Sequence, residues 1–264
     1  MVAQRQVVLT NPVSDEGLRV IDPTSPSFPS EISNLLGADV RTKASSFLPW
    51  SFIIVNETGR YVWGFTFIYT FPDNLAPSGA PRQIRISPSP GGPAPREALL
   101  SPGSKYLVTP VMDFYAALDA NGVRVRRPIV DNQTDRFIRI FRSTHPNMNE
   151  RVQASVDSLI YEDGTIVGPD MAGNQTRVND EIHADRDLVA MLTNLKGENL
   201  RSHFANMRPG NRPKDAYSSR VDAVASALKD IFSREGENGL RKRLEIMKLN
   251  DWFPNPGYVR RKSE

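Results

Sequence analysis

The clearest pattern of hydrophobic and polar positions in the chain lies at 61–71, where every odd position carries an aromatic ring. Small or β-branched residues occupy most of the positions between the rings. Successive side chains of a strand point to opposite faces, so a period of two places all the rings on one side. Aromatic and β-branched residues are also frequent in strands. The run therefore predicts a long strand with one aromatic face, formed by Tyr61, Trp63, Phe65, Phe67, Tyr69 and Phe71.

The preceding residues predict a partner strand for this run. Large residues alternate over 48–55, and the segment 56–59 ends in Gly59, which can adopt the positive φ of a turn. If Val55 pairs with Arg60, each large residue of the first strand faces the aromatic side of the second. The expected cross-strand pairs are Ile54 with Tyr61, Phe52 with Trp63, Trp50 with Phe65, and Leu48 with Phe67.

The aromatic face has two interpretations. It is either the inner face of a β-sandwich or an exposed platform on which sugar rings or bases stack. Large exposed apolar patches are rare on soluble proteins, so the pattern favours the core. On this interpretation, Trp63→Ala is expected to cost several kcal/mol of stability.

Further short strand patterns flank this hairpin. A Pro-, Gly- and Ser-rich loop is expected over 72–104, interrupted by a short strand near Ile84 and Ile86. Strand patterns that follow one another without long helices favour an antiparallel sandwich over a parallel sheet. A short helix is expected over 30–36. The other expected strands are 7–9, 18–21, 106–109, 123–126, 135–142, 152–161 and 165–167.

Beyond residue 168 the hydrophobic period becomes that of helices. Helices are expected over 175–195 and 199–207, and a third begins after Asp215, which can cap it, and is interrupted at Gly236. Their apolar stripes either pack within the chain or bind a partner. The expected organisation is a sandwich over 1–168, a helical segment over 169–250 and an extended basic tail over 251–264.

Composition narrows the function classes. The chain of 264 residues has no cysteine, which excludes disulfides, thiol catalysis and zinc–thiolate sites. Residues 1–195 carry 18 basic and 21 acidic side chains, whereas residues 196–264 carry 15 basic and 9 acidic ones. This basic excess suits an anionic partner, but it is too modest to favour nucleic acid.

The start of the chain and its longest apolar runs bear on its compartment. Residues 1–20 lack the pattern of a signal peptide, and no apolar run is long enough to span a membrane. We therefore expect either a cytoplasmic protein or a mature or trimmed form of a secreted one. The sequence leaves the oligomeric state open.

Candidate chemistry is confined to acidic clusters. Asp180, His183 and Asp187 have the spacing of one helix face, and two carboxylates with an imidazole suit a divalent transition metal. A solvated helix face with intrahelical ion pairs is the commoner meaning of such a run. Acidic residues over 162–164, with Asp170, offer a weaker calcium candidate, although Asp-Gly is ordinary hairpin chemistry. The motifs of serine hydrolases, P-loops, dinucleotide-binding folds and zinc proteases are absent, and we expect no cofactor.

Two stretches of the sequence resemble patterns found in known groups of proteins. Residues 51–59 with the aromatic strand look like the opening hairpin of immunoglobulin-like sandwich modules. Residues 158–170, running into a charged helix, resemble a pattern in uncharacterised bacterial proteins that combine such a sandwich with trailing helices. The resemblance implies a mainly β chain, an antiparallel immunoglobulin-like β-sandwich followed by a small helical region, and it implies no activity or site residues.

We therefore expect a non-enzymatic binding or structural module that contacts a protein partner through its C-terminal helices. One alternative is a metal-assisted hydrolase that uses the cluster at 180–187. Another is a carbohydrate-binding module that uses exposed aromatic rings. Folds of this class host many functions, so the choice depends on a site.

Overall fold

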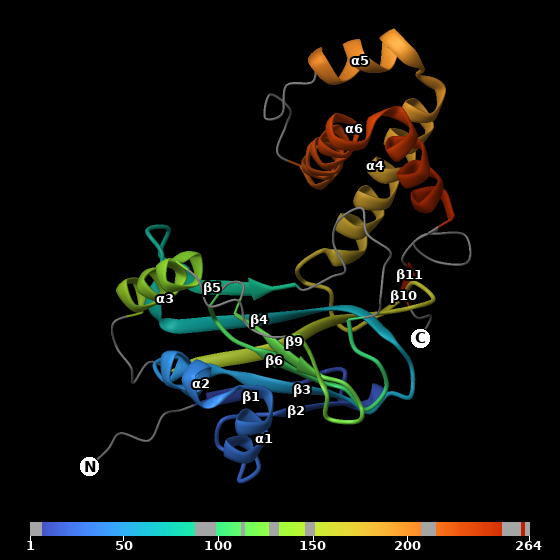
Figure 1. Ribbon diagram of the computed structural model, residues 1–264. Coiled ribbons are helices and arrows are strands. Elements are labelled where there is room, and N and C mark those ends of the chain that lie inside the picture. Colours follow the sequence, from blue (N-terminus) through green and yellow to red (C-terminus); the bar gives the residue numbers. More distant parts are fainter. Residues whose placement is uncertain are drawn as a thin grey trace. The chain divides into compact units, whose positions relative to one another are not determined.

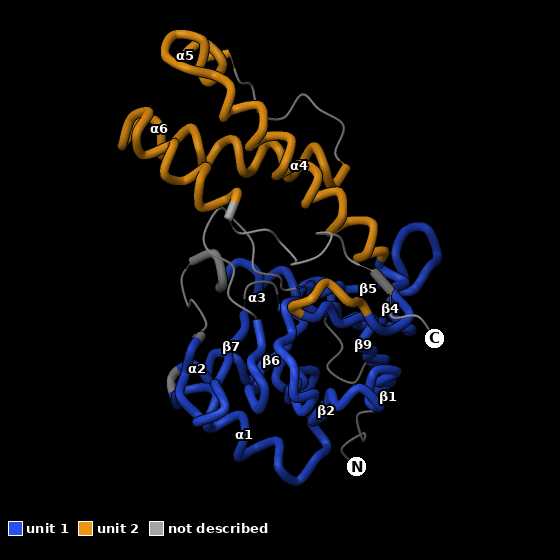
Figure 2. The backbone as a smooth tube through the Cα atoms, turned by 90° about the vertical axis from the view of Figure 1, so that its right-hand side faces the viewer, with its two compact units in different colours: residues 1–89, 98–161, 167–172 blue, residues 90–97, 162–166, 173–264 orange. Residues whose placement is uncertain are grey.

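The chain divides into two compact units, distinguished by colour in Figure 2. The first comprises residues 1–89, 98–161 and 167–172, and the second comprises residues 90–97, 162–166 and 173–264. The computed structural model describes residues 7–87, 99–111, 114–126, 132–145, 151–206, 215–249 and 260–261. Helices make up 46% of the described residues and strands 27%, so "mainly β" describes the first unit better than the whole chain.

One sheet of the first unit is built around two long strands, β4 and β9, which pair antiparallel (Figure 1). β5 pairs antiparallel with β4, whereas β1 pairs parallel with β9. Within the second unit, Thr165 and Ile166 of β10 pair parallel with β11. The expectation of a purely antiparallel sandwich is therefore wrong. β1 and β9 are far apart in the sequence, so no tight turn connects them and forces them to pair antiparallel. The bounds are β1 Val7–Thr10, β4 Val62–Leu75, β5 Pro81–Ile86, β9 Val152–Tyr161, β10 Thr165–Val167 and β11 Arg260–Arg261.

The second sheet has five strands in the order β2-β3-β6-β7-β8, all antiparallel. Its strand β3 is buried at all five positions, as expected for a strand that has neighbours on both edges and is covered on both faces. The bounds are β2 Leu18–Ile21, β3 Phe52–Asn56, β6 Lys105–Val108, β7 Ala116–Leu118 and β8 Arg124–Arg126.

The predicted hairpin between β3 and β4 is wrong, because these two strands lie in different sheets. Val55 pairs with Arg19 of β2 and Lys105 of β6 instead of Arg60. The large residues of the two strands do meet, but across the core: the ring of Phe52 lies 5.0 Å from that of Phe67 between centroids. Residues 48–50, expected to extend the strand, form the 3₁₀ helix η2 (Leu48–Trp50).

The aromatic face of β4 is buried, which confirms the core interpretation for most of the run. Four of its rings belong to the core cluster of the first unit. Tyr69 also donates a hydrogen bond to the carbonyl of Val108 (3.1 Å), and burial raises the pKa of its phenol well above the ordinary value. Only Tyr61 is substantially exposed, at 46%, so the run forms no stacking platform. The buried core rings are Phe65, Phe67, Tyr69 and Phe71.

Among the described residues of the first unit, three α-helices accompany the sheets: α1 (Phe28–Leu35), α2 (Ala38–Ala44) and α3 (Asn132–Thr144). α1 corresponds to the short helix expected over 30–36. The strand expected over 135–142 is wrong, because this segment is α3. Ile138 and Phe141 are buried three residues apart, which is helical spacing.

A buried carboxylate fixes the chain after β10. Asp157 is fully buried, and its two carboxylate oxygens accept hydrogen bonds from the backbone N–H groups of Met171 (2.7 Å) and Ala172 (2.9 Å). Gly168 has a φ of 102°, and a Cβ there would lie 2.5 Å from the carbonyl oxygen of Asp157. Glycine is therefore required where the chain passes this close.

Asp157→Ala is expected to lower the free energy of unfolding by about 1.5–3 kcal/mol, because the variant removes the acceptor of two charge-assisted hydrogen bonds. Urea titration followed by tryptophan fluorescence measures the loss. Asp157→Asn is the matched control, since its one amide oxygen can retain one of the two bonds and should lose less. Equal stability of the alanine variant and the original chain would contradict this role.

The second unit is helical, and α4 and α6 lie side by side in both views (Figures 1 and 2). The three expected helices are confirmed as α4 (Asn174–Asn194), α5 (Gly197–Asn206) and α6 (Ala216–Leu249). Their apolar stripes form a core of their own. No helix in the described ranges combines the length and apolar character needed to cross a membrane. The extended basic tail expected over 251–264 lies outside the described residues except for 260–261.

The boundaries of α6 follow the sequence signals. The carboxylate of Asp215 accepts a hydrogen bond from the backbone N–H of Ser218 (2.6 Å), which caps the helix as expected and lowers the pKa of Asp215. Gly236 has a φ of 68° and a ψ of −166°, and it breaks α6 into two arms, 216–235 and 237–249.

Candidate functional site

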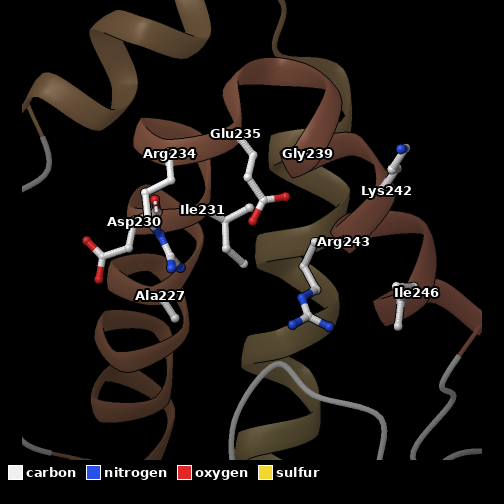
Figure 3. A pocket seen from close by; sticks show the side chains of 9 residues that line it. All are labelled: Ala227, Asp230, Ile231, Arg234, Glu235, Gly239, Lys242, Arg243 and Ile246. Atoms are coloured by element: carbon white, nitrogen blue, oxygen red, sulfur yellow. Dashed lines mark hydrogen bonds between the residues drawn. The ribbon is translucent and has the colours of Figure 1, made fainter.

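The two arms of α6 enclose a groove that is open to solvent (Figure 3). We call it the α6 groove. Its volume is about 370 Å³, and Ala227 and Ile231 of the first arm and Ile246 of the second supply its apolar surface. The complete lining is Ala227, Asp230, Ile231, Arg234, Glu235, Gly239, Lys242, Arg243 and Ile246.

Two glycines shape the α6 groove. Gly236 supplies the left-handed residue at which the chain changes direction. At Gly239 a Cβ would lie 2.3 Å from the Cβ of Glu235 and 2.7 Å from its Oε2 atom. Glycine at 239 therefore lets the side chain of Glu235 lie against the second arm.

The charges around the α6 groove are incompletely neutralised. Arg234, Lys242 and Arg243 supply three cations, whereas Asp230 and Glu235 supply two carboxylates. Within the described part of the chain, none of the three cations forms an ion pair with a carboxylate, and Arg234 donates only to the backbone carbonyl of Asp230 (3.3 Å). Figure 3 shows the side chains of Ile231, Glu235 and Arg243 directed toward the space between the arms.

A neighbouring arginine holds the second arm in place. Arg241 donates to the backbone carbonyls of Leu192 and Thr193 (both 3.0 Å) and of Leu195, at the C-terminal end of α4. It also pairs with Glu237 (2.8 Å), and this bond lowers the pKa of the Glu237 carboxyl. Arg241 is thus committed to structure, whereas Arg243 on the same arm forms no ion pair among the described residues.

A buried ion pair joins the first arm to α4. The guanidinium of Arg220 donates to both carboxylate oxygens of Asp185, at 2.7 and 2.8 Å. The two side chains are 10% and 9% exposed. Sequence reasoning singled out this acidic run but not its buried member. The helical spacing of Asp185 with the apolar positions Ile182 and Leu188 was the available signal.

The metal candidates of α4 lie on its more accessible side. Asp180 is half-buried, whereas His183 and Asp187 are exposed. Asp187 accepts a hydrogen bond from the hydroxyl of Tyr217 (2.7 Å). In the described part of the chain, no group of three or more His, Asp or Glu side chains is arranged to hold a metal ion. The metal site at 180–187 stays a prediction.

The weaker calcium candidates take local roles in the backbone. Asp163 accepts a hydrogen bond from the backbone N–H of Thr165 (2.9 Å), as in an ordinary turn. Asp170 has a φ of 54°, and its backbone N–H donates to the carbonyl of Asp157 (3.1 Å). These backbone roles explain the positions of Asp163 and Asp170 without invoking a bound cation. Calcium binding at these residues stays a prediction.

A histidine that sequence reasoning did not select is buried in the first unit. His145 is 4% exposed, and its ring lies 4.2 Å from that of Phe71 and 4.7 Å from that of Phe141 between centroids. Its Nδ1 atom lies 2.9 Å from the hydroxyl oxygen of Thr144 and 3.3 Å from the carbonyl oxygen of Phe141, while Nε2 is buried and has no partner among the described residues. Burial lowers the pKa of His145, and the charge of Arg82 lowers it further, although the Phe141 bond opposes both.

This environment makes the stability of the first unit depend on pH. The unfolded chain binds a proton at His145 below about pH 6.5, whereas the folded chain resists it, so stability is expected to fall as the pH drops below that value. Urea titrations at several pH values measure the slope. His145→Gln should flatten it, while His183→Gln, at an exposed position, should not. An unchanged slope in His145→Gln would contradict the assignment.

The α6 groove is the feature of the described residues best suited to binding. Its centre is apolar, and the guanidinium groups on its rim form no ion pair with any residue that the structure describes. Comparisons with protein-family models, with curated proteins and with solved structures give no match for this chain.

Proposed function

We propose that this protein is a non-enzymatic binding module in which a two-sheet unit accompanies a helical unit that contacts a protein partner. The observation that carries the proposal is the α6 groove, where apolar side chains from two helical arms lie among cations that have no ion-pair partner in the described part of the chain. Grooves between helices are a common means of receiving a segment of another protein.

The alternatives have less support. A carbohydrate-binding module on the β4 rings would need an exposed aromatic platform, and those rings lie in the core. A metal-assisted hydrolase at 180–187 would need at least three converging ligands. The proposal also takes the two-sheet unit to be of immunoglobulin-like type and its relatives to be bacterial. Two packed sheets with a shared aromatic core support this assignment of type.

Site-specific photo-crosslinking in cells that make the protein tests the proposal. A benzophenone amino acid replaces Ile246 in the α6 groove, Met191 on α4, or Val125 in the first unit, all of which are exposed. We expect a discrete protein adduct from position 246 and weaker or no adducts from 191 and 125. The absence of a discrete adduct at 246, or turnover of a substrate by the full chain, would contradict the proposal.

A further inference from the structure

We infer that the α6 groove receives an acidic segment of a protein chain, which places an apolar side chain between Ile231 and Ile246 and a carboxylate on Arg243. This inference rests on the proposed function and adds the chemistry of the partner. Three properties of the groove support this inference. Its cations form no ion pairs among the described residues, its centre is apolar, and its lining includes carboxylates.

The cations call for an anionic ligand. Arg243 is half-buried, and its guanidinium has no ion-pair partner among the described residues. Arg234 on the opposite arm is exposed, and among the described residues it bonds only to a backbone carbonyl. A partly buried guanidinium leaves donors unused, and a carboxylate can accept two of them in a fixed fork geometry. An acidic side chain of a partner would therefore be bound most strongly at Arg243.

The centre of the groove calls for an apolar group beside that carboxylate. Ile246 is 37% exposed on the second arm, opposite Ile231 and Ala227 of the first. Covering these side chains removes apolar surface from water, which favours binding in proportion to the area covered. A volume of about 370 Å³ suits a few side chains of a peptide.

The carboxylates of the groove distinguish a protein segment from a nucleic acid. Nucleic-acid surfaces gather positive charge to meet a continuous line of phosphates. Asp230 and Glu235 interrupt the positive charge of the α6 groove and would repel such a line. The same carboxylates can accept hydrogen bonds from the backbone N–H groups of a peptide. The mixture of charges therefore favours an acidic, partly apolar protein segment.

Fluorescence anisotropy with the full chain tests the inference. The probe is a fluorescein-labelled peptide of alternating Glu and Leu, and the comparison probes are the equivalent Gln–Leu peptide and single-stranded oligothymidine. At low ionic strength, where charge interactions are least screened, we expect saturable binding of the Glu–Leu peptide and at least about tenfold weaker binding of the other two. Arg243→Gln should lower the affinity for the Glu–Leu peptide by about tenfold, which is the usual effect of losing a charge-assisted hydrogen bond.

Lys248→Gln is the matched control, because it removes one positive charge from the same arm at a residue already paired with Glu245 (2.9 Å). We expect it to change the affinity less than about twofold, as for an exposed ion pair. Circular dichroism establishes that both variants remain helical. Equal losses in the two variants would reveal unspecific charge attraction and overturn the inference.

The comparison probes supply the other contradicting outcomes. If the Gln–Leu peptide bound as tightly as the Glu–Leu peptide, acidic side chains would not be required for recognition, and the inference would be overturned. Tighter binding of oligothymidine would assign the groove to nucleic acid. Failure of the Glu–Leu peptide to bind would overturn the inference on partner chemistry, whereas an adduct from position 246 in cells would still support a protein partner. The two proposals can therefore fail separately.

Discussion

Phe67→Ala is expected to lower the free energy of unfolding of the first unit by about 3–5 kcal/mol, the usual cost of truncating a core phenylalanine. The ring of Phe67 is fully buried and contacts Phe52 of the opposite sheet and Tyr69 of its own strand, at centroid distances of 5.0 and 5.1 Å. Its removal would open a cavity between the two sheets. Urea titration followed by tryptophan fluorescence reports largely on this unit, because two of the chain's three tryptophans, Trp50 and Trp63, lie within it.

Tyr61→Ala is the matched control, because Tyr61 belongs to the same alternating run but is 46% exposed. Its effect should stay within about 0.5 kcal/mol, as for most surface substitutions. Similar losses of unfolding free energy in Phe67→Ala and Tyr61→Ala would mean that the buried ring contributes no more to stability than the exposed one. The account of the core would then be wrong.

Arg220→Ala is expected to destabilise the helical unit by about 3–5 kcal/mol, because it leaves the carboxylate of Asp185 buried without its bidentate partner. A thermal melt followed by circular dichroism at the helical minimum measures the change. The double variant Asp185→Ala/Arg220→Ala should lose less than the sum of the two single variants, because the second substitution removes the unpaired charge.

Arg201→Ala is the control for this ion pair. Arg201 lies 3.8 Å from Glu198, and both side chains are largely exposed, so the variant should change stability by about 0–1 kcal/mol. A melt of Arg220→Ala that matches that of Arg201→Ala would contradict the view that the buried pair stabilises the joint between α4 and α6.

The alternating aromatic run predicted the strand β4 and its burial, but it did not predict the partner. The alternation of the aromatic residues, with a period of two, indicates which side chains share a face. It does not state whether they meet residues of a neighbouring strand in the same sheet or residues of an opposing sheet. Phe52 and Phe67 satisfy the pattern in the second way. For the same reason, the parallel pairing of β1 with β9 has no local signal in the sequence.

The helices were easier to predict where period and caps agreed. α4 and α6 have long apolar stripes, and Asp215 and Gly236 mark a start and an interruption of α6. α3 was mistaken for a strand because its apolar residues, read over only eight positions, suited both periods. The buried pair of Ile138 and Phe141 shows the period that applies.

The candidate site was only partly predictable. The sequence indicated the interruption of the helix at Gly236, but the α6 groove depends on the return of the second arm beside the first. The metal hypothesis for Asp180, His183 and Asp187 rests on their spacing along one helix face, and it stays a prediction.

Methyl NMR of the full chain during titration with the Glu–Leu peptide tests the central claim, that the α6 groove is the binding surface. Isoleucine methyl groups are suitable because Ile231 and Ile246 line the groove, whereas Ile32 and Ile54 lie in the core of the first unit. The account predicts that the signals of Ile231 and Ile246 shift in a saturable way while those of Ile32 and Ile54 stay in place. Saturable binding that leaves Ile231 and Ile246 unperturbed would contradict it.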